Sequence, residues 1–269
     1  MNVYYNDNEP FVCAWLRNLI AAKLLPAGDV DERSIEQVMP DEVRGYTQAH
    51  FFAGIGGWPY ALQLAGWGDR SVWTGSCPCQ PFSLAGQRKT EDDSRHLWPT
   101  WFRLIRECEP GRIFGEQVAG AVGQGWWDVV STELEAEAYT VGAVVLGAHS
   151  VGAPHIRQRL FFVADANGAG REDVEGGTRS TDATGRTFTG TQSDAIRVAA
   201  ESRVGKLGRV EQPEKGNAGR GLSWWITEPA VDRVAYGVPG RVGRLRAYGN
   251  AIVPQVAAAF VKAYLDCRP

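Results

Sequence analysis

A cysteine in a proline-rich loop is the residue of this 269-residue chain best suited to covalent chemistry. Cys79 lies in the stretch Ser76-Cys77-Pro78-Cys79-Gln80-Pro81-Phe82-Ser83, directly after a run typical of a strand, Ser71 to Gly75. The prolines disfavour a helix, so the loop is expected to be rigid and to lie at the carboxyl end of a strand, where α/β proteins place their active sites. We therefore predict that Cys79 is a nucleophile, because its thiolate could be reached by a substrate. Cys77 is a candidate for a buried structural cysteine.

A second candidate is the glycine-rich segment Phe51 to Trp58, which follows a strand pattern and opens a helical one. Glycines permit positive φ angles and let the backbone lie against a cofactor at the end of a strand. This context favours a nucleotide-binding loop. The alternative is a tight turn between strand and helix that binds nothing.

Alternating strand and helix patterns must position these two loops. They predict an α/β fold with a doubly wound, parallel sheet over residues 2–146 and one further strand after it. The predicted strands are Val3 to Tyr5, His50 to Ala53, Ser71 to Gly75, Arg112 to Glu116, Thr140 to Leu146 and Leu160 to Ala164. The predicted helices are Glu9 to Leu25, Trp58 to Ala65, Leu97 to Glu107, Trp126 to Glu137 and Pro254 to Leu265.

The composition is that of a globular protein, with 44% hydrophobic and 22% charged residues. No apolar run approaches the roughly 18 residues of a membrane span, and we expect a cytoplasmic protein. The five cysteines show neither disulfide density nor the spacing of a zinc site, so reduced thiols and no metal are expected. A net charge of -3 offers no global electrostatic argument for a nucleic-acid partner, which must be argued from local sites.

The composition changes after Asp165, which suggests three regions. Residues 168–221 are rich in Gly, Thr, Arg and acidic residues and contain one aromatic residue, Phe188, too little apolar area for a core of their own. We predict a catalytic domain over 1–165, a small target-recognition region over 166–235, and a segment over 236–269 that returns to the catalytic domain. A solvated linker is the alternative for the middle region.

Six segments in order resemble motifs of the cytosine-5 DNA methyltransferase family. They are Phe-Ala-Gly-Ile-Gly-Gly at 52–57, Pro-Cys-Gln at 78–80, Asp-Ser-Arg with Leu97, Glu-Gln-Val at 116–118, Gly152 to Arg159, and Gly-Asn-Ala-Ile-Val at 249–253. The departures are mild, with Gln117 for the family's Asn and Ala251 for its Ser. Both could weaken the support of the catalytic loop.

The resemblance implies a covalent mechanism. Cys79 would add to carbon 6 of a flipped cytosine and make carbon 5 nucleophilic towards the methyl group of S-adenosyl-L-methionine (AdoMet). Glu116 would act at ring nitrogen 3, and Arg159 at the 2-keto oxygen. We expect Arg157 and Arg159 on one face of an extended segment, while Gln80 and Ser83 would hold the DNA. A surface carboxylate and a solvated arginine pair are the alternatives.

The N-terminus resembles two cofactor motifs that the family carries after its glycine loop. Val3 to Phe11 is similar to the strand with the ribose-binding acid, here Asp7, and Gly28 to Ile35 is similar to the block whose acid meets adenine, either Asp29 or, by spacing, Asp31. We infer a rearranged motif order; an acidic segment without a ligand is the alternative. The residues assigned to AdoMet are Asp7, Asn8, Asp31, Phe52, Ala53, Gly54, Ile55, Gly56, Gly57, Trp58, Pro78, Leu97, Asn250 and Ala251.

The sequence therefore predicts an AdoMet-dependent DNA cytosine-5 methyltransferase with a Rossmann-like sheet, of the compact kind found in phages and mobile elements. Double-stranded DNA would be its partner; the oligomeric state stays open, with a monomer as one option. The rival functions are the same chemistry on another pyrimidine acceptor, the transfer of another one-carbon group, and a non-catalytic relative that binds DNA or AdoMet. Cys79, Glu116 and Arg159 together argue against the last.

Overall fold

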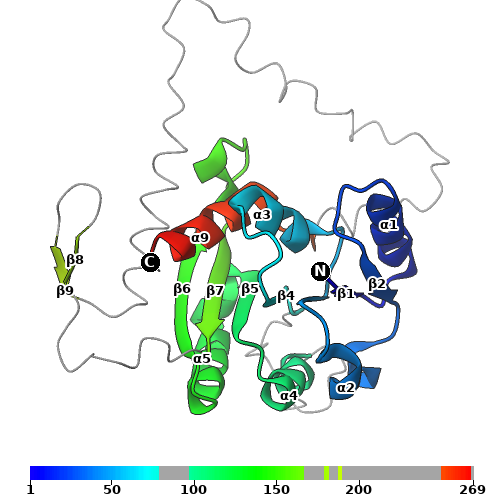
Figure 1. Ribbon diagram of the computed structural model, residues 1–269. Helices are drawn as coiled ribbons and strands as arrows, with labels where there is room; N and C mark the ends of the chain where they lie inside the picture. The colour runs from blue at the N-terminus through cyan, green and yellow to red at the C-terminus, as the bar shows by residue number, and fades with distance from the viewer. Residues whose placement is uncertain (79–96, 167–178, 182–186, 190–249, 268–269) are drawn as a thin grey trace, which may run out of the picture.

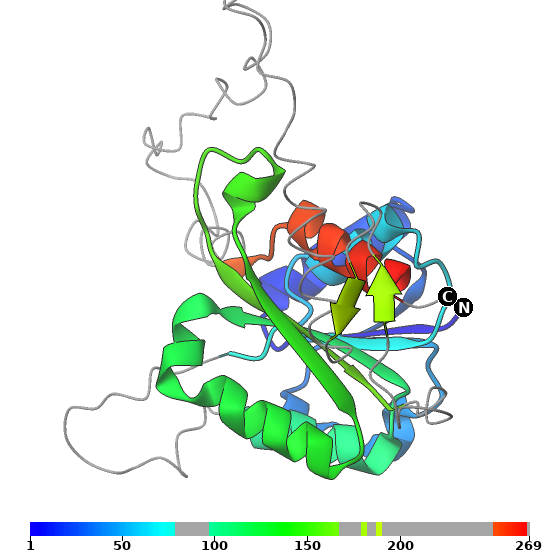
Figure 2. The ribbon, with the colours of Figure 1, turned by 90° about the vertical axis from the view of Figure 1, so that its left-hand side faces the viewer.

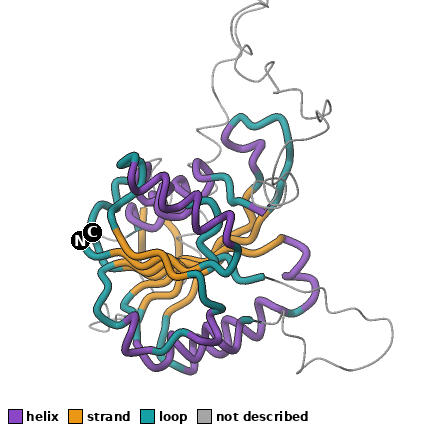
Figure 3. Tube along the Cα trace, turned by 90° about the vertical axis from the view of Figure 1, so that its right-hand side faces the viewer, coloured by secondary structure: helices purple, strands orange, loops and turns teal. Residues whose placement is uncertain are grey.

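The computed structural model describes residues 1–78, 97–166 and 250–267, together with the backbone of two short strands, β8 (Arg179–Thr181) and β9 (Thr187–Thr189), which pair antiparallel. A seven-stranded sheet forms the middle layer, and helices cover both of its faces (Figures 1 and 3). The predicted α/β class is confirmed. The predicted nucleophile Cys79, the predicted DNA-binding residues Gln80 and Ser83, and most of the predicted recognition region lie outside the described residues.

The sheet has the strand order β2-β1-β3-β4-β5-β7-β6. Its strands are β1 (Val3–Asn6), β2 (Gly28–Asp31), β3 (Gln48–Phe51), β4 (Val72–Gly75), β5 (Arg112–Val118), β6 (Thr140–Leu146) and β7 (Arg159–Asp165). The first five run parallel, but β7 runs antiparallel to both β5 and β6, so the expectation of a parallel sheet is wrong at this edge. The reason is that β6 and β7 form a long hairpin (Figure 2).

Three helices pack on each face. One face carries α1 (Pro10–Ala21), α3 (Gly57–Ala65) and α9 (Pro254–Asp266), and the other carries α2 (Pro40–Val43), α4 (Trp98–Cys108) and α5 (Trp126–Ala136). The five predicted helices are present. The first ends earlier than predicted because Lys23 takes a positive φ of 58° just after its last turn, which ends the helical hydrogen bonding.

The C-terminal helix α9 belongs to the same hydrophobic core as the sheet. Phe260 and Tyr264 are buried against Phe114 of β5, with ring centroids 6.0 Å and 5.4 Å from it. The Tyr264 hydroxyl donates to the carboxylate of Asp165 and accepts a hydrogen bond from Arg112 Nε at 2.8 Å. The chain therefore returns to the α/β body at its end, as expected.

The connections between the parallel strands differ in hand. The connection from β1 to β2 passes through α1 on one face of the sheet. The connections from β2 to β3 and from β4 to β5 cross the sheet in the opposite direction and pass through α2 and α4 on the other face. A crossover connection keeps its handedness when both its direction across the sheet and the face that carries its helix are reversed. These three connections therefore have the same handedness. The step from β3 to β4 goes the same way but uses α3, on the face of α1 (Figures 1 and 3). It has the opposite hand, and since about 98% of such connections are right-handed, it is the left-handed exception.

In the part of the chain that the structure describes, every helix is too short or too polar to cross a membrane.

Candidate active site

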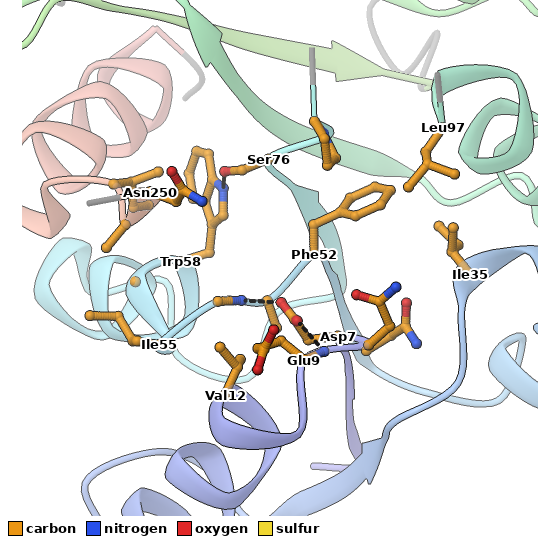
Figure 4. Close-up of a pocket in the computed structure, with 18 of the residues that line it drawn as sticks. Asp7, Glu9, Val12, Ile35, Phe52, Ile55, Trp58, Ser76, Leu97 and Asn250 are labelled. Carbon is orange, nitrogen blue, oxygen red and sulfur yellow. Dashed lines mark hydrogen bonds between the residues drawn. The ribbon is translucent and has the colours of Figure 1, made fainter. Parts of the chain in front are cut away.

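The N-terminal strand and the glycine loop meet at one point of the sheet. Strand β1 pairs directly with β3, so the residues that follow their carboxyl ends are neighbours although more than forty residues separate them in sequence. The backbone N–H of Gly54 donates to Asp7 Oδ2 at 2.9 Å, and that of Glu9 donates to Asp7 Oδ1 at 3.0 Å (Figure 4). Both loops lie at the carboxyl end of the sheet, which is the end where open α/β sheets bind ligands.

The loop after β3 has a backbone that most residues would not adopt. Gly54 and Gly56 have φ angles of +54° and +85°, and Phe52, which is not a glycine, has φ +50°. Such a conformation in a bulky residue costs free energy and is found mainly where the loop has a function. Gly57 is required for another reason, since a Cβ there would lie 2.6 Å from Ile252 Cγ1. The loop therefore brings the segment before α9 against the start of α3.

A cavity of about 290 Å³ lies between these loops, near the lower end of the size range of small-molecule sites. Most residues that the sequence assigns to the cofactor line it: Asp7, Asn8, Phe52, Ala53, Gly54, Ile55, Gly57, Trp58, Pro78, Leu97, Asn250 and Ala251. Those that sequence reasoning missed are Asn6, Glu9, Val12, Ser34, Ile35, Ser76 and Ile252. Gly56 does not line the cavity; a Cβ there would lie 2.6 Å from Leu25 Cδ1.

Asp31 requires a correction, because it lines a different hollow at the edge of the sheet. Its carboxylate accepts a hydrogen bond from the Tyr4 hydroxyl at 2.7 Å and forms a salt bridge with Arg33 at 2.7 Å. Asp29 lies in the same hollow and accepts a hydrogen bond from Tyr46 at 2.6 Å. Neither acid reaches the cavity. The residues of this part of the chain that do are Ser34 and Ile35, at the start of a short 3₁₀ helix.

The chemistry of the cavity walls suits a nucleoside, which has a flat apolar ring and hydroxyl groups. Phe52, Ile35 and Leu97 form an apolar side, as a flat ring would need (Figure 4). Asp7 presents a largely buried carboxylate, and burial raises the pKa of this group although the Gly54 and Glu9 N–H groups lower it. Each carboxylate oxygen has a second lone pair, so Asp7 can accept further hydrogen bonds from ligand hydroxyls. The described residues thus fit AdoMet.

A buried ion pair lies beside the cavity. Glu116, near the carboxyl end of β5, is only 6% exposed, and its Oε1 lies 2.8 Å from Arg159 Nε on β7. The two meet because Arg159 pairs with Val118, the residue two positions after Glu116 on the same face. Burial raises the pKa of Glu116, while the Arg159 charge, a hydrogen bond from Ser76 and the Arg157 charge lower it. The net effect is a pKa above the usual value for a glutamate, which favours a carboxyl that holds a proton and can share it with a ligand.

Arg157 lies near the same carboxylate but not on an extended segment. Its φ of +35° marks a turn before β7, so the alternation expected for Arg157 and Arg159 does not hold. The chain turns there, and Arg157 Nη2 donates to the backbone oxygen of Ala251 at 2.6 Å. Arg157 therefore links the segment before α9 to the site.

The start of the catalytic loop is held from β5. Gln117 Nε2 donates to the backbone oxygen of Cys77 at 2.9 Å, so glutamine at this position does support the loop. Cys77 is 3% exposed and belongs to the hydrophobic core, as expected of a structural cysteine. Pro78 lines the cavity, and Cys79 is the next residue in sequence.

Comparison with known proteins shows what part of the chain is similar to. Residues 67–195 match the profile of the C-5 cytosine-specific DNA methylase family. Among curated proteins, the chain is similar to the type II methyltransferase M.AgeI of Thalassovita gelatinovora, with 32% identity over 104 residues, or 38% of this chain and 24% of that protein. It is similar to M.NgoMIV of Neisseria gonorrhoeae, with 30% identity over 109 residues, or 39% and 35% of the two chains. The matched stretches thus span about a third or less of these relatives.

The fold comparison covers the whole chain. The structure of the Dnmt2 methyltransferase of S. pombe superposes with a TM-score of 0.51 and 12% identity, over 99% of this chain and 98% of that one. At this identity the likeness concerns the fold alone, and it agrees with a methyltransferase-type α/β sheet.

Proposed function

We propose that this chain is an AdoMet-dependent DNA cytosine-5 methyltransferase, because residues 67–195 match the profile of the C-5 cytosine-specific DNA methylase family. One observation carries the proposal: the Glu116–Arg159 pair and the cavity formed by the Asp7 and Gly54 loops meet at the start of the Pro-Cys loop. Gln117, which follows Glu116, donates to the backbone oxygen of Cys77; Pro78 lines the cavity, and the proposed nucleophile Cys79 comes next in the chain. A cofactor pocket, a proton site and a nucleophile are the three parts that the reaction needs.

AdoMet, when bound, supplies an electrophilic methyl group. Asp7 accepts hydrogen bonds from the ribose hydroxyls, because its carboxylate is fixed by the N–H groups of Gly54 and Glu9. Phe52, Ile35 and Leu97 shield the adenine from water. These residues would hold the nucleoside part of the cofactor.

Glu116 and Arg159 act on the cytosine. The thiolate of Cys79 forms a bond to carbon 6, and the electrons of the 5,6 double bond become available at carbon 5 for attack on the methyl group. Glu116 gives a proton to, or shares one with, ring nitrogen 3, and Arg159 donates to the 2-keto oxygen, which stabilises the developing charge. Water then takes the proton from carbon 5, the thiolate of Cys79 leaves carbon 6, and the proton on ring nitrogen 3 returns to Glu116, which restores the aromatic ring.

The substrate is double-stranded DNA with the target cytosine turned out of the helix, since carbons 5 and 6 cannot be attacked within the stack. We assign Gln80 and Ser83 to the space left by the base and to the phosphate. Residues 166–235 are assigned to target recognition, between the catalytic domain at 1–165 and the returning segment at 236–269. Arg and Lys side chains of this region would contact the phosphates.

The test is covalent trapping. DNA that carries 5-fluorocytosine should form a stable complex with the protein in the presence of AdoMet, because fluorine cannot leave as a proton does. Cys79→Ser should form none, whereas Cys77→Ser, a matched variant two residues away, should still form it. Trapping that is lost in Cys77→Ser and kept in Cys79→Ser would reassign the nucleophile.

Sequencing of methylated cytosines in DNA from cells that express the chain identifies the acceptor and its context. Methylation of RNA or of free nucleotides without methylation of DNA would replace the DNA substrate by another pyrimidine acceptor. The complete absence of transfer in a folded protein that binds AdoMet would favour a non-catalytic relative.

A further inference from the structure

The segment before α9 forms one wall of the proposed cofactor cavity. Asn250, Ala251 and Ile252 line the cavity, and Asn250 lies there beside Trp58 (Figure 4). Ile252 is 7% exposed and packs on the start of α3, where it leaves no room for a side chain on Gly57. One side of this segment therefore rests on the glycine loop.

A charged side chain holds the same segment from the turn before β7. Arg157 Nη2 donates to the backbone oxygen of Ala251 at 2.6 Å, which joins two residues that are 94 positions apart in the chain. The guanidinium stays protonated in proteins, and hydrogen bonds from charged donors are stronger than those from neutral ones. Arg157 is not among the residues that line the cavity, so it contacts the wall without contacting a ligand inside it.

The turn that carries Arg157 is itself fixed. The backbone N–H of Ala148 donates at 2.7 Å to the backbone oxygen of Ile156, the residue before Arg157, and Ala148 is fully buried. Arg157 has a φ of +35°, which a residue with a side chain adopts at a cost in free energy. Such a conformation persists only where the surrounding contacts require it, and these strained positions cluster at functional sites. The turn thus presents the guanidinium to Ala251 from a defined position.

We propose that Arg157 is a positioning residue for the cofactor, which holds the segment 250–252 in the conformation that binds AdoMet. The inference rests on the proposed function in one respect, AdoMet as the ligand of the cavity. Two arginines close together in sequence then have different tasks, since Arg159 pairs with Glu116. A wall that is ordered before binding increases affinity, because the apparent affinity is reduced by the fraction of protein that is not in the competent conformation.

The rival role for Arg157 is a direct one at the proton site. Its charge lowers the pKa of Glu116, which burial raises. The two roles predict different measurements. A positioning role changes the affinity for AdoMet when no DNA is present, whereas a role at the proton site changes the rate of transfer and its pH dependence but not that affinity.

The first experiment measures AdoMet binding by calorimetry without DNA. Arg157→Met, which keeps an unbranched side chain but removes the charge and the donors, should raise the Kd about 5- to 20-fold, a part of the effect of a hydrogen bond to a charged group. Arg157→Lys keeps a charged donor and should give an intermediate Kd. Arg112→Met is the matched control and should leave the Kd unchanged, because Arg112 donates to Tyr264 near the other end of α9, at 2.8 Å and outside the cavity.

A double-mutant cycle tests whether Arg157 acts through the segment. Asn250→Ala removes a side chain of the segment that lines the cavity. Arg157→Met should then cost a smaller factor in Kd in the Asn250→Ala background than in the unmodified protein, as expected of residues that act as a unit. Equal factors in both backgrounds would mean that Arg157 acts by another route and would overturn the inference.

Methyl transfer to DNA supplies a second readout. Arg157→Met should raise the KM for AdoMet by a larger factor than it lowers kcat, whereas general damage to the fold would not favour KM in this way. A lower kcat with an unchanged Kd for AdoMet, in a variant that thermal unfolding shows to be folded, would assign Arg157 to the proton site and overturn the inference. Should Arg157→Met not fold, Arg157→Lys is judged by the same criteria.

The outcomes separate this inference from the proposed function. If Arg157→Met weakens AdoMet binding as expected but the unmodified protein transfers no methyl group to DNA, the role of Arg157 stands and the proposed function fails. If the unmodified protein binds AdoMet and Arg157→Met binds it equally well, the inference alone fails. If the unmodified protein does not bind AdoMet, both fail.

Discussion

Replacing Asp7 by alanine is expected to weaken AdoMet binding by about 1 to 3 kcal/mol, or roughly 5- to 150-fold in Kd. Asp7 accepts hydrogen bonds from the N–H groups of Gly54 and Glu9 at 2.9 Å and 3.0 Å, so its loss leaves two donors at the cavity without a partner. The ribose hydroxyls lose their acceptor at the same time. Hydrogen bonds to a charged group contribute about 1.5 to 3 kcal/mol each, of which water that enters the cavity restores a part.

Asp7→Asn provides an intermediate case. The amide keeps the shape of the side chain but has one acceptor oxygen, so it can satisfy only one of the two N–H donors. A smaller loss of affinity than in Asp7→Ala is expected. Asp31→Ala is the matched control, because the Asp31 carboxylate faces the Tyr4 hydroxyl and Arg33 outside the cavity.

Isothermal titration calorimetry with AdoMet measures these affinities, and thermal unfolding shows whether each variant is folded. Unchanged affinity in a folded Asp7→Ala would remove the assignment of Asp7 to the ribose and, with it, the main support for the rearranged motif order. A larger loss in Asp31→Ala than in Asp7→Ala would return the acid at the edge of the sheet to the cofactor.

Further predictions concern stability and recognition. Burial lowers the pKa of His50 to about 3, so below the usual pKa of 6.5 the folded state binds fewer protons than the unfolded state. The free energy of unfolding should therefore fall by about 2 kcal/mol between pH 7 and pH 5. In urea titrations, His50→Phe should remove this pH dependence. Gly75→Ala would place a Cβ 2.6 Å from the Trp101 ring and should cost about 1 to 3 kcal/mol of stability in the same assay, whereas Gly45→Ala, with open space around it, should not. Replacing 168–221 by a short Gly-Ser linker should leave AdoMet binding nearly intact but weaken DNA binding and blur the methylated context in sequencing; equal rates at the same sites would make this stretch a linker.

The sequence predicted the elements of the sheet well, because alternating and helical apolar patterns reflect burial directly. It could not predict the direction of β7, since apolar alternation is the same in a parallel and an antiparallel strand. The pairing of β1 with β3 was implied only by the motif resemblance, and the hydrogen bond between Gly54 and Asp7 agrees with it.

The sequence likewise predicted some residues of the candidate site and could not predict others. Glycines, prolines and charged residues at strand ends are visible in the sequence, and most of those predicted lie around one cavity. Asp31 was misplaced because spacing along the chain does not reveal Tyr4, which reaches its carboxylate from the neighbouring strand. Ser76 was missed because a serine at a strand end has no distinctive pattern; only its place in the cavity wall and its hydrogen bond from Trp58 distinguish it.

The left-handed connection from β3 through α3 to β4 has a consequence for a gene in which the order of these segments is changed. If the segment 46–66, which contains β3 and α3, were moved ahead of β1, α3 would connect β3 to β1. The helix would stay on its present face, but the connection would cross the sheet in the opposite direction. It would then be right-handed, like most such connections. The chain would then run from α2 to β4 across the other face, again with that hand. Every strand would keep its neighbours, and Asp7 would still meet Gly54. The three-dimensional site is thus independent of the order in which the gene encodes its parts.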